Sequence, residues 1–169
     1  RLAAEQGNVA AQYNLGVRCD QGLAVAKNEK EATRWYRLSA EQGDSLAQFH
    51  LGLRYDKGQG MAKNETEATR WYRLAAEQGL ANAQFNLGLR YDKGQGIAKD
   101  DKEAVRWFRL AAEQGLANAQ FNLGLRYDKG QGIAKDDKEA VRWFRLAAEQ
   151  GDSLAQFHLG LSYDEGQGM

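Results

Sequence analysis

The residues of this chain that could do chemistry are few, and their spacing does not assemble a catalytic site. His50 and His158 are the only two histidines, and they occupy equivalent positions three repeats apart in an internally repeated sequence. Helix layers pack about 8–10 Å apart, so the two rings should be tens of ångströms from each other. They can form neither a shared metal site nor a dyad, and no Ser/His/Asp set accompanies them. We expect no catalytic, metal-binding or cofactor-binding residues.

Two local motifs imitate ligand-binding loops. Residues 92–103 place acids at positions 1, 9 and 12 of a calcium loop, but positions 3 and 5 are Gly94 and Gly96 and position 6 is not glycine. The two glycines could cradle a phosphate, yet no strand precedes them and the Lys-Ser/Thr tail of a P-loop is missing. We interpret Asp100 and Glu103 as a helix capping box, and the glycines as a helix end and tight turn.

Cys19 is the single cysteine, so the chain has no internal disulfide and its redox compartment is undetermined. The equivalent positions in the other repeats hold tyrosine: Tyr55, Tyr91, Tyr127 and Tyr163. We interpret Cys19 as a small hydrophobic replacement and not as a reactive thiol.

The composition argues against two classes of partner. Basic and acidic residues balance at 23 each, so no net charge attracts the chain to nucleic acid or to an anionic membrane. The mean hydropathy is −0.70 and apolar runs are short, so we expect no transmembrane span. No signal peptide is visible, but we expect the sequence to start inside a repeat, so the compartment stays open.

The elements that must position these residues come from a repeat of 36 residues. Trp35, Trp71, Trp107 and Trp143 recur with this spacing, and residues 79–114 and 115–150 are identical at all 36 positions. A fixed period of this size predicts a stack of small supersecondary units.

Each repeat is predicted to contain a first helix, helix A, and a second, helix B. In residues 79–114, helix A covers about 81–93 and helix B runs from the Asp100 cap to Gln114. Gly88 lies inside helix A, where glycine costs about 1 kcal/mol relative to alanine, so we expect close helix packing there. Helix B has an apolar arc that buries its tryptophan, formed by Ala104, Val105, Trp107, Phe108, Ala111 and Ala112.

We expect one continuous array over residues 1–169. It comprises a partial helix B (1–6), repeats 1 to 4 (7–42, 43–78, 79–114 and 115–150) and a partial repeat 5 (151–169). Neither end carries a polar capping repeat, so we expect a piece of a longer array with exposed apolar surface at both ends.

The recurring pattern A-x-F/Y-x-L-G-x-x-Y-x-x-G-x-G, followed by an N/D cap and A-x-x-W-F/Y-x-x-A-A-E-Q-G, resembles the Sel-1-like repeat, a relative of the tetratricopeptide repeat. The residues that match are Ala83, Leu87, Gly88, Tyr91, Gly94, Gly96, Ala104, Trp107, Ala111, Ala112 and Gly115. The resemblance covers the whole chain and implies an all-α, right-handed α/α superhelical solenoid. It also implies a scaffold or adaptor for protein–protein contact, and no enzymatic activity.

The chain departs from the family pattern in three respects. The proline often found before the helix B cap is alanine here, and the cysteines of the disulfide-rich subgroup are missing. A position that is often lysine is leucine in every repeat: Leu38, Leu74, Leu110 and Leu146. These leucines either form an exposed ridge for association or fold over their own tryptophan or the adjoining repeat, which we favour.

The candidate binding site is the polar arc of helix A, which lines the concave face in related superhelices. Its members are Asn14, Arg18, His50, Arg54, Lys57, Asn82, Asn86, Arg90, Lys93, Asn118, Asn122, Arg126, Lys129 and His158. Asparagine amides and arginine forks could clamp a peptide backbone and its acidic side chains. The alternative is a solvated helix face, partly neutralised by Asp56, Asp92 and Asp128.

The sequence therefore predicts a non-catalytic scaffold that binds a protein or peptide on its concave helix-A face. The residues we expect to matter most are Arg54, Arg90, Arg126, Asn86, Asn122 and His50. One alternative is an architectural array that associates end to end. Nucleic-acid binding, which zero net charge argues against, and glycan binding are further alternatives.

Overall fold

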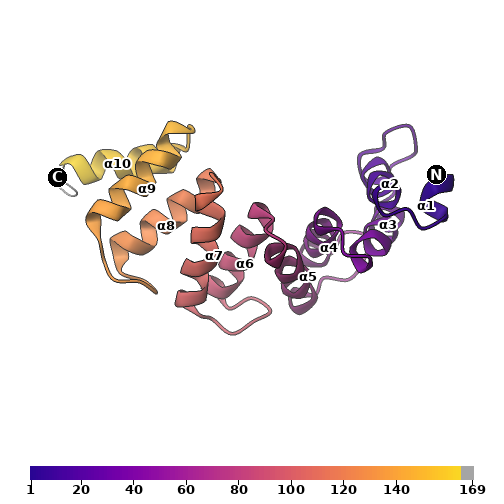
Figure 1. Ribbon diagram of the computed structural model, residues 1–169, viewed down its shortest axis with the longest axis horizontal. Coiled ribbons are helices and arrows are strands. Elements are labelled where there is room, and N and C mark those ends of the chain that lie inside the picture. The colour runs from indigo at the N-terminus through magenta and orange to yellow at the C-terminus, as the bar shows by residue number, and fades with distance from the viewer. Residues whose placement is uncertain (165–169) are drawn as a thin grey trace. The chain divides into compact units, whose positions relative to one another are not determined.

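The computed structural model describes residues 1–164, and every regular element in that range is an α-helix (Figure 1). The helices are α1 (Leu2–Glu5), α2 (Val9–Gln21), α3 (Glu29–Glu41), α4 (Ser45–Lys57), α5 (Glu65–Glu77), α6 (Ala81–Lys93), α7 (Asp101–Glu113), α8 (Ala117–Lys129), α9 (Asp137–Glu149) and α10 (Ser153–Asp164). The even-numbered helices are the helices A, and the odd-numbered ones are the helices B. No described helix is long and apolar enough to cross a membrane.

Contacts within the chain define two compact units. Unit 1 comprises Arg1–Ala83 with Gln95–Ile97, and unit 2 comprises Gln84–Gly94 with Ala98–Met169. Within each unit, the helices A and B of one repeat pack side by side, as α2 with α3, α4 with α5 and α8 with α9 (Figure 1). The all-α solenoid of helix-turn-helix repeats is therefore confirmed, whereas a single body over the whole chain stays a prediction.

Local sequence signals set the helix ends. The Asp100 carboxylate accepts hydrogen bonds from the backbone N–H groups of Lys102 (2.9 Å) and Glu103 (3.0 Å), as an N-cap should. The second hydrogen bond of the predicted capping box, from the Asp100 backbone N–H to the Glu103 carboxylate, does not form. The Glu103 carboxylate instead accepts from the indole N–H of Trp107 (3.1 Å), and the Asp100 N–H donates to the Tyr91 carbonyl (3.0 Å).

The glycine loop after each helix A needs a left-handed backbone. Gly130 ends α8 with φ +63°, and Gly132 follows with φ +73°. A side chain on Gly132 would collide with the Asp101 carbonyl at the start of α7, so the loop of repeat 4 packs on helix B of repeat 3.

The glycine inside helix A permits the close packing that the sequence predicts. A Cβ atom added at Gly124 would lie 2.7 Å from the ring of Phe144 and 3.3 Å from the Ala140 carbonyl. The Phe144 ring is 1% exposed, so it fills the space that the glycine leaves. Helices α8 and α9 therefore meet through an aromatic ring seated on bare backbone.

The exposure of the tryptophans, the recurring leucines and Cys19 shows what each of these positions does in the fold. The four tryptophans are between 4% and 7% exposed, as predicted. Leu38, Leu74 and Leu146 are half-buried and pack against the hydrophobic clusters, which agrees with the folded-over alternative. Cys19 is buried, and burial raises the pKa of its thiol, as suits a small hydrophobe.

Candidate functional site

The residues predicted to bind a ligand, here called the helix-A face, differ widely in exposure. The exposed members are Asn14, Arg18, Lys57, Asn82, Lys93, Asn118 and Lys129. The half-buried members are His50, Asn86, Asn122 and His158. Of the four arginines at equivalent positions, Arg18 is exposed and the other three are buried, with Arg54 3%, Arg90 5% and Arg126 8% exposed. Glu165, which continues this stripe in the sequence, lies outside the described residues.

The buried arginines have partners inside the protein. Arg126 on α8 donates to the carboxylate of Asp92 on α6 (2.6 Å) and to the side-chain oxygen of Gln131 (3.0 Å). Its guanidinium carbon lies 5.8 Å from the centre of the Phe108 ring. In unit 1, Arg54 forms the equivalent ion pair with Asp20. Arg54 and Arg126 thus join helices A of adjacent repeats and do not project as open donors, so a ligand contact by them stays a prediction.

The sequence carries a signal for these ion pairs that helix-wheel reasoning missed. Asp20 precedes Arg54 by the same 34 residues that separate Asp92 from Arg126, so acid and base recur in register. In repeat 5 the arginine is replaced by Ser162, whose hydroxyl donates to the His158 carbonyl (3.0 Å). Among the described residues, therefore, no arginine pairs with Asp128 as Arg126 pairs with Asp92.

The histidines pack on aromatic rings. The His50 ring stacks on Tyr36, with ring centres 4.9 Å apart and an interplanar angle of 11°, and Tyr13 and Phe49 flank it. His158 stacks in the same way on Phe144 (5.3 Å, 29°). Both histidines belong to the polar arc of helix A that is predicted to face a ligand. Both rings instead fill part of the interface with the preceding helix B.

The environment of His50 makes this interface sensitive to acid. Burial lowers the pKa of His50 below its ordinary value, and Arg54 also lowers it, while Asp20 and Asp44 oppose the shift. Since the folded state disfavours the proton, stability is complete above the unfolded pKa of about 6.5 and falls as the pH drops below it.

We expect a His50→Asn variant to lose less stability than the wild-type chain between pH 7.5 and pH 5. Asparagine occupies this position in repeats 3 and 4, so the variant should fold. Urea unfolding at each pH measures the difference, and the comparison cancels the carboxylates common to both proteins. Parallel loss of stability in the two proteins would remove His50 as the cause.

Buried glutamines on helix A form a second set of contacts between repeats, which the sequence analysis did not identify. The side-chain amide of Gln120 donates to the Ala112 carbonyl (3.2 Å) and its oxygen accepts from Gln150 (2.8 Å). Gln48 makes the same two bonds, with Ala40 and Gln78. The signal in the sequence is an Ala-Gln pair that recurs near the start of every helix A.

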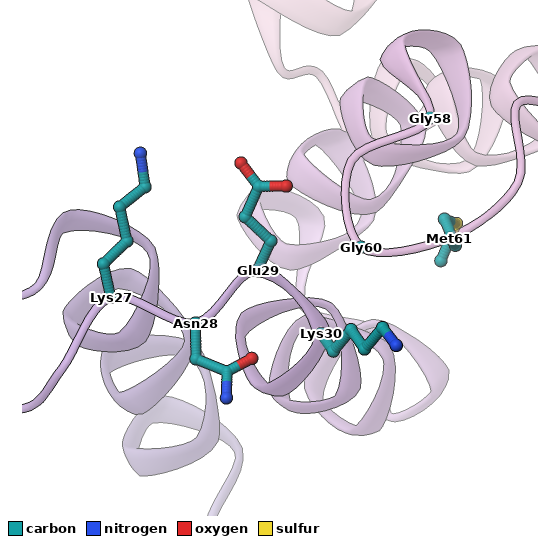
Figure 2. A pocket seen from close by; sticks show the side chains of 7 residues that line it. All are labelled: Lys27, Asn28, Glu29, Lys30, Gly58, Gly60 and Met61. Carbon is teal, nitrogen blue, oxygen red and sulfur yellow. The ribbon is translucent and has the colours of Figure 1, made fainter.

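An open pocket of about 640 Å³ lies between the start of α3 and the loop after α4 (Figure 2). Asn28 lines it, but the side chain of Asn28 is used as the cap of α3, accepting from the Glu31 N–H at 3.1 Å. Figure 2 shows that the side chains of Lys27, Glu29 and Lys30 do not converge on one point. The pocket therefore lacks the convergent polar groups of a ligand site.

The calcium-like residues have structural roles. Asp100 caps α7, Glu103 accepts from Trp107, and Asp92 pairs with Arg126. Within residues 1–164, no group of three or more histidine, cysteine or acidic residues could hold a metal ion.

Comparisons with known proteins agree with this geometry. The family model described as Sel1 repeat matches residues 9–44, 45–80, 81–116, 117–152 and 153–169. These segments begin two residues later than the repeats defined above and have the same period. No curated protein matches the chain.

Solved structures that are similar to this chain include the following three. A protective antigen of uropathogenic Escherichia coli displaying an SLR fold is 38% identical with a TM-score of 0.95, over 99% of this chain and 36% of that one. A Sel1 repeat protein from Oxalobacter formigenes is 46% identical with a TM-score of 0.92, over 97% and 68%. Cysteine rich protein B of Helicobacter pylori, 23% identical with a TM-score of 0.62 over 79% and 96%, shares the fold.

The chain spans about a third of the length of the Escherichia coli antigen, so that protein's properties do not transfer to it as a whole. The resemblance seen in the sequence is nevertheless confirmed by five consecutive family matches. The chain belongs to the Sel1 repeat family.

Proposed function

We propose that this chain is a non-catalytic scaffold that binds an acidic peptide segment of another protein on the exposed part of the helix-A face. Sel1 repeat proteins are generally protein-interaction scaffolds. The observation that carries the proposal is that this face presents lysines without acidic partners, while nearby acidic side chains are already paired with arginines. Lys57, Lys93 and Lys129 are exposed and form no ion pair with any described residue, whereas Asp20 and Asp92 are engaged by arginines.

The exposed side chains suit an extended peptide. In unit 2, the Asn118 amide can donate to and accept from a peptide backbone, and Lys93 and Lys129 attract acidic side chains. The ion pairs Arg54–Asp20 and Arg126–Asp92 hold α4 against α2 and α8 against α6, so the exposed lysines of these helices are presented from rigid elements.

The test uses two triple variants that make the same change of charge. Lys57, Lys93 and Lys129 are changed to glutamate in the first, and Lys30, Lys102 and Lys138, which are exposed on helices B, in the second. Peptides are selected from a displayed random library on the wild-type chain and measured by fluorescence polarisation. We expect acidic peptides to bind the first variant about tenfold or more weakly, and the second nearly as well as wild type.

Equal weakening in both variants would show that binding follows total charge and not this face. Selected peptides without acidic residues, bound equally by all three proteins, would also contradict the proposal.

A second candidate function is end-to-end association, which the exposed apolar side chains of α10 favour. Phe157 is 62% and Leu154 59% exposed, and no described helix packs over Gly160. Light scattering at two concentrations tests it. We expect a mass that rises above 18.8 kDa with concentration and a strict monomer for Phe157→Gln. A wild-type chain that stays monomeric would count against association.

A further inference from the structure

Cys19 occupies a position of the repeat that is tyrosine in every other repeat. In three repeats the tyrosine at this position lies against an arginine of the preceding helix B. The Tyr55 hydroxyl accepts from Arg37 Nη2 (3.1 Å), that of Tyr127 from Arg109 (3.0 Å) and that of Tyr163 from Arg145 (2.9 Å). The protein therefore contains a repeated internal binding site for a tyrosine side chain, in which an arginine donates to the phenol oxygen.

Repeat 1 has residues equivalent to those around the tyrosine, but it has no tyrosine ring among them. The residue is Cys19, and a cavity of about 280 Å³ opens beside it. The cavity is lined by Arg1, Leu15, Cys19, Val25, Trp35 and others. An engineered apolar cavity of about 150 Å³ holds benzene, so this one has room for a single aromatic ring.

Four residues that line the cavity correspond to residues of the hydrophobic cluster around Tyr55 in repeat 2. Tyr55 and Met61 pack on the cluster that contains Leu51 and Trp71. The residues 36 positions earlier are Cys19, Val25, Leu15 and Trp35, and all four line the cavity. Arg1 precedes Arg37 by the same interval, so the phenol-binding arginine of the other repeats has an equivalent in the lining.

The loop beside the cavity is more apolar than its counterparts. Leu23, Ala24 and Val25 stand where repeat 2 has Gln59, Gly60 and Met61. Ala24 keeps the left-handed backbone of that glycine, with φ +58°, and is among the residues that line the cavity. The lining thus combines apolar residues such as Leu15, Val25 and Trp35 with the polar residues Arg1, Arg18 and Glu31.

We propose that this cavity is a binding site for a para-substituted phenol, such as the tyrosine side chain of a partner. The ring would occupy the place that Tyr55 fills in repeat 2, against Leu15 and Trp35. The hydroxyl would accept from Arg1, as the tyrosines accept from Arg37, Arg109 and Arg145. Arg1 uses its Nε for Glu5 (2.9 Å), whereas the other arginines bind the phenol through Nη2. This site is separate from the exposed lysines of the helix-A face.

The test compares the wild-type chain with Cys19→Tyr, which places in the cavity the ring that the other repeats carry. Three probes are titrated into 15N-labelled protein: p-cresol, toluene and a short peptide with one tyrosine. We expect p-cresol, at about millimolar concentration, to shift the signals of Leu15, Val25 and the Trp35 indole, and toluene to bind several-fold more weakly. Cys19→Tyr should keep its helical circular dichroism and lose these shifts. A peptide that reproduces them identifies a partner side chain, and p-cresol alone identifies a small phenol.

A second measurement does not depend on how the variant folds. The chain has one cysteine, so mass spectrometry of the intact chain follows N-ethylmaleimide addition at Cys19 alone. We expect saturating p-cresol to slow this addition several-fold. Unchanged labelling together with no shifts, p-cresol shifts that persist in a folded Cys19→Tyr variant, or equal binding of toluene and p-cresol would each overturn the phenol site. The lysine variants of the helix-A face should bind p-cresol normally, so the two proposals fail independently.

Discussion

Replacing Gly124 with alanine is expected to lower the free energy of unfolding by about 1–3 kcal/mol, as overpacking of a well-filled interior does. The added Cβ would lie 2.7 Å from the Phe144 ring, a distance at which one of the two must move. The ring cannot yield cheaply because it is fully buried, and the Ala140 carbonyl closes the other side at 3.3 Å. The strain should exceed the gain in helix propensity that alanine brings.

Gly160 provides a matched control at the equivalent position of α10. A Cβ there meets nothing within 4 Å, so only the helix-propensity term remains. We expect Gly160→Ala to raise stability by about 0.5–1 kcal/mol, the opposite sign to Gly124→Ala. Urea unfolding followed by circular dichroism measures both. The same sign in both variants would show that the glycine column is not a packing requirement.

Replacing Arg126 with methionine is expected to cost about 2 kcal/mol. Breaking a fully buried ion pair by removing one partner costs about 3–5 kcal/mol. The cost should be lower here because the Asp92 side chain stays 22% exposed and keeps some hydration. Methionine keeps most of the side-chain stem, so the loss reports on the charge and its hydrogen bonds more than on volume.

A double-mutant cycle separates the ion pair from other effects. Asp92→Asn together with Arg126→Met should cost less than the sum of the two single changes, because neither partner is then left with an unmatched charge. Lys129→Met, on the same helix but exposed, should stay within about 0.5 kcal/mol of wild type. Additive costs for Asp92 and Arg126 would mean that the two charges do not stabilise each other.

The helices could be predicted closely because their determinants are local. The bounds of α6 and the cap of α7 follow from apolar spacing, the Asp100 side chain and the glycines, all within one repeat. Gly88 could be predicted to mark close packing because a glycine inside a helix needs a compensating contact.

The candidate site was harder to predict because its determinants lie in neighbouring repeats. A wheel drawn for α8 alone places Arg126 on a polar face and therefore in solvent. The structure buries it because α6 supplies the Asp92 carboxylate and α7 the Phe108 ring. The burial of His50 has the same origin, since the Tyr36 ring that stacks on it belongs to another helix. The spacing of Asp100 and Glu103 fits a capping box, but in the fold the Glu103 carboxylate accepts from the indole N–H of Trp107 on the same helix.

The glutamine contacts between repeats have a consequence for how such a protein changes over generations. Gln120 donates backward to helix B of its predecessor and accepts forward from helix B of its own repeat, and Gln48 does the same. These contacts use the same residues in each repeat, so they can form between any two copies that follow one another. A gene that gains or loses a 36-residue block therefore still encodes joints whose amides are all matched. The number of repeats becomes a trait that can vary by recombination while each interface stays intact, and the identical blocks 79–114 and 115–150 are suitable substrates for such an exchange.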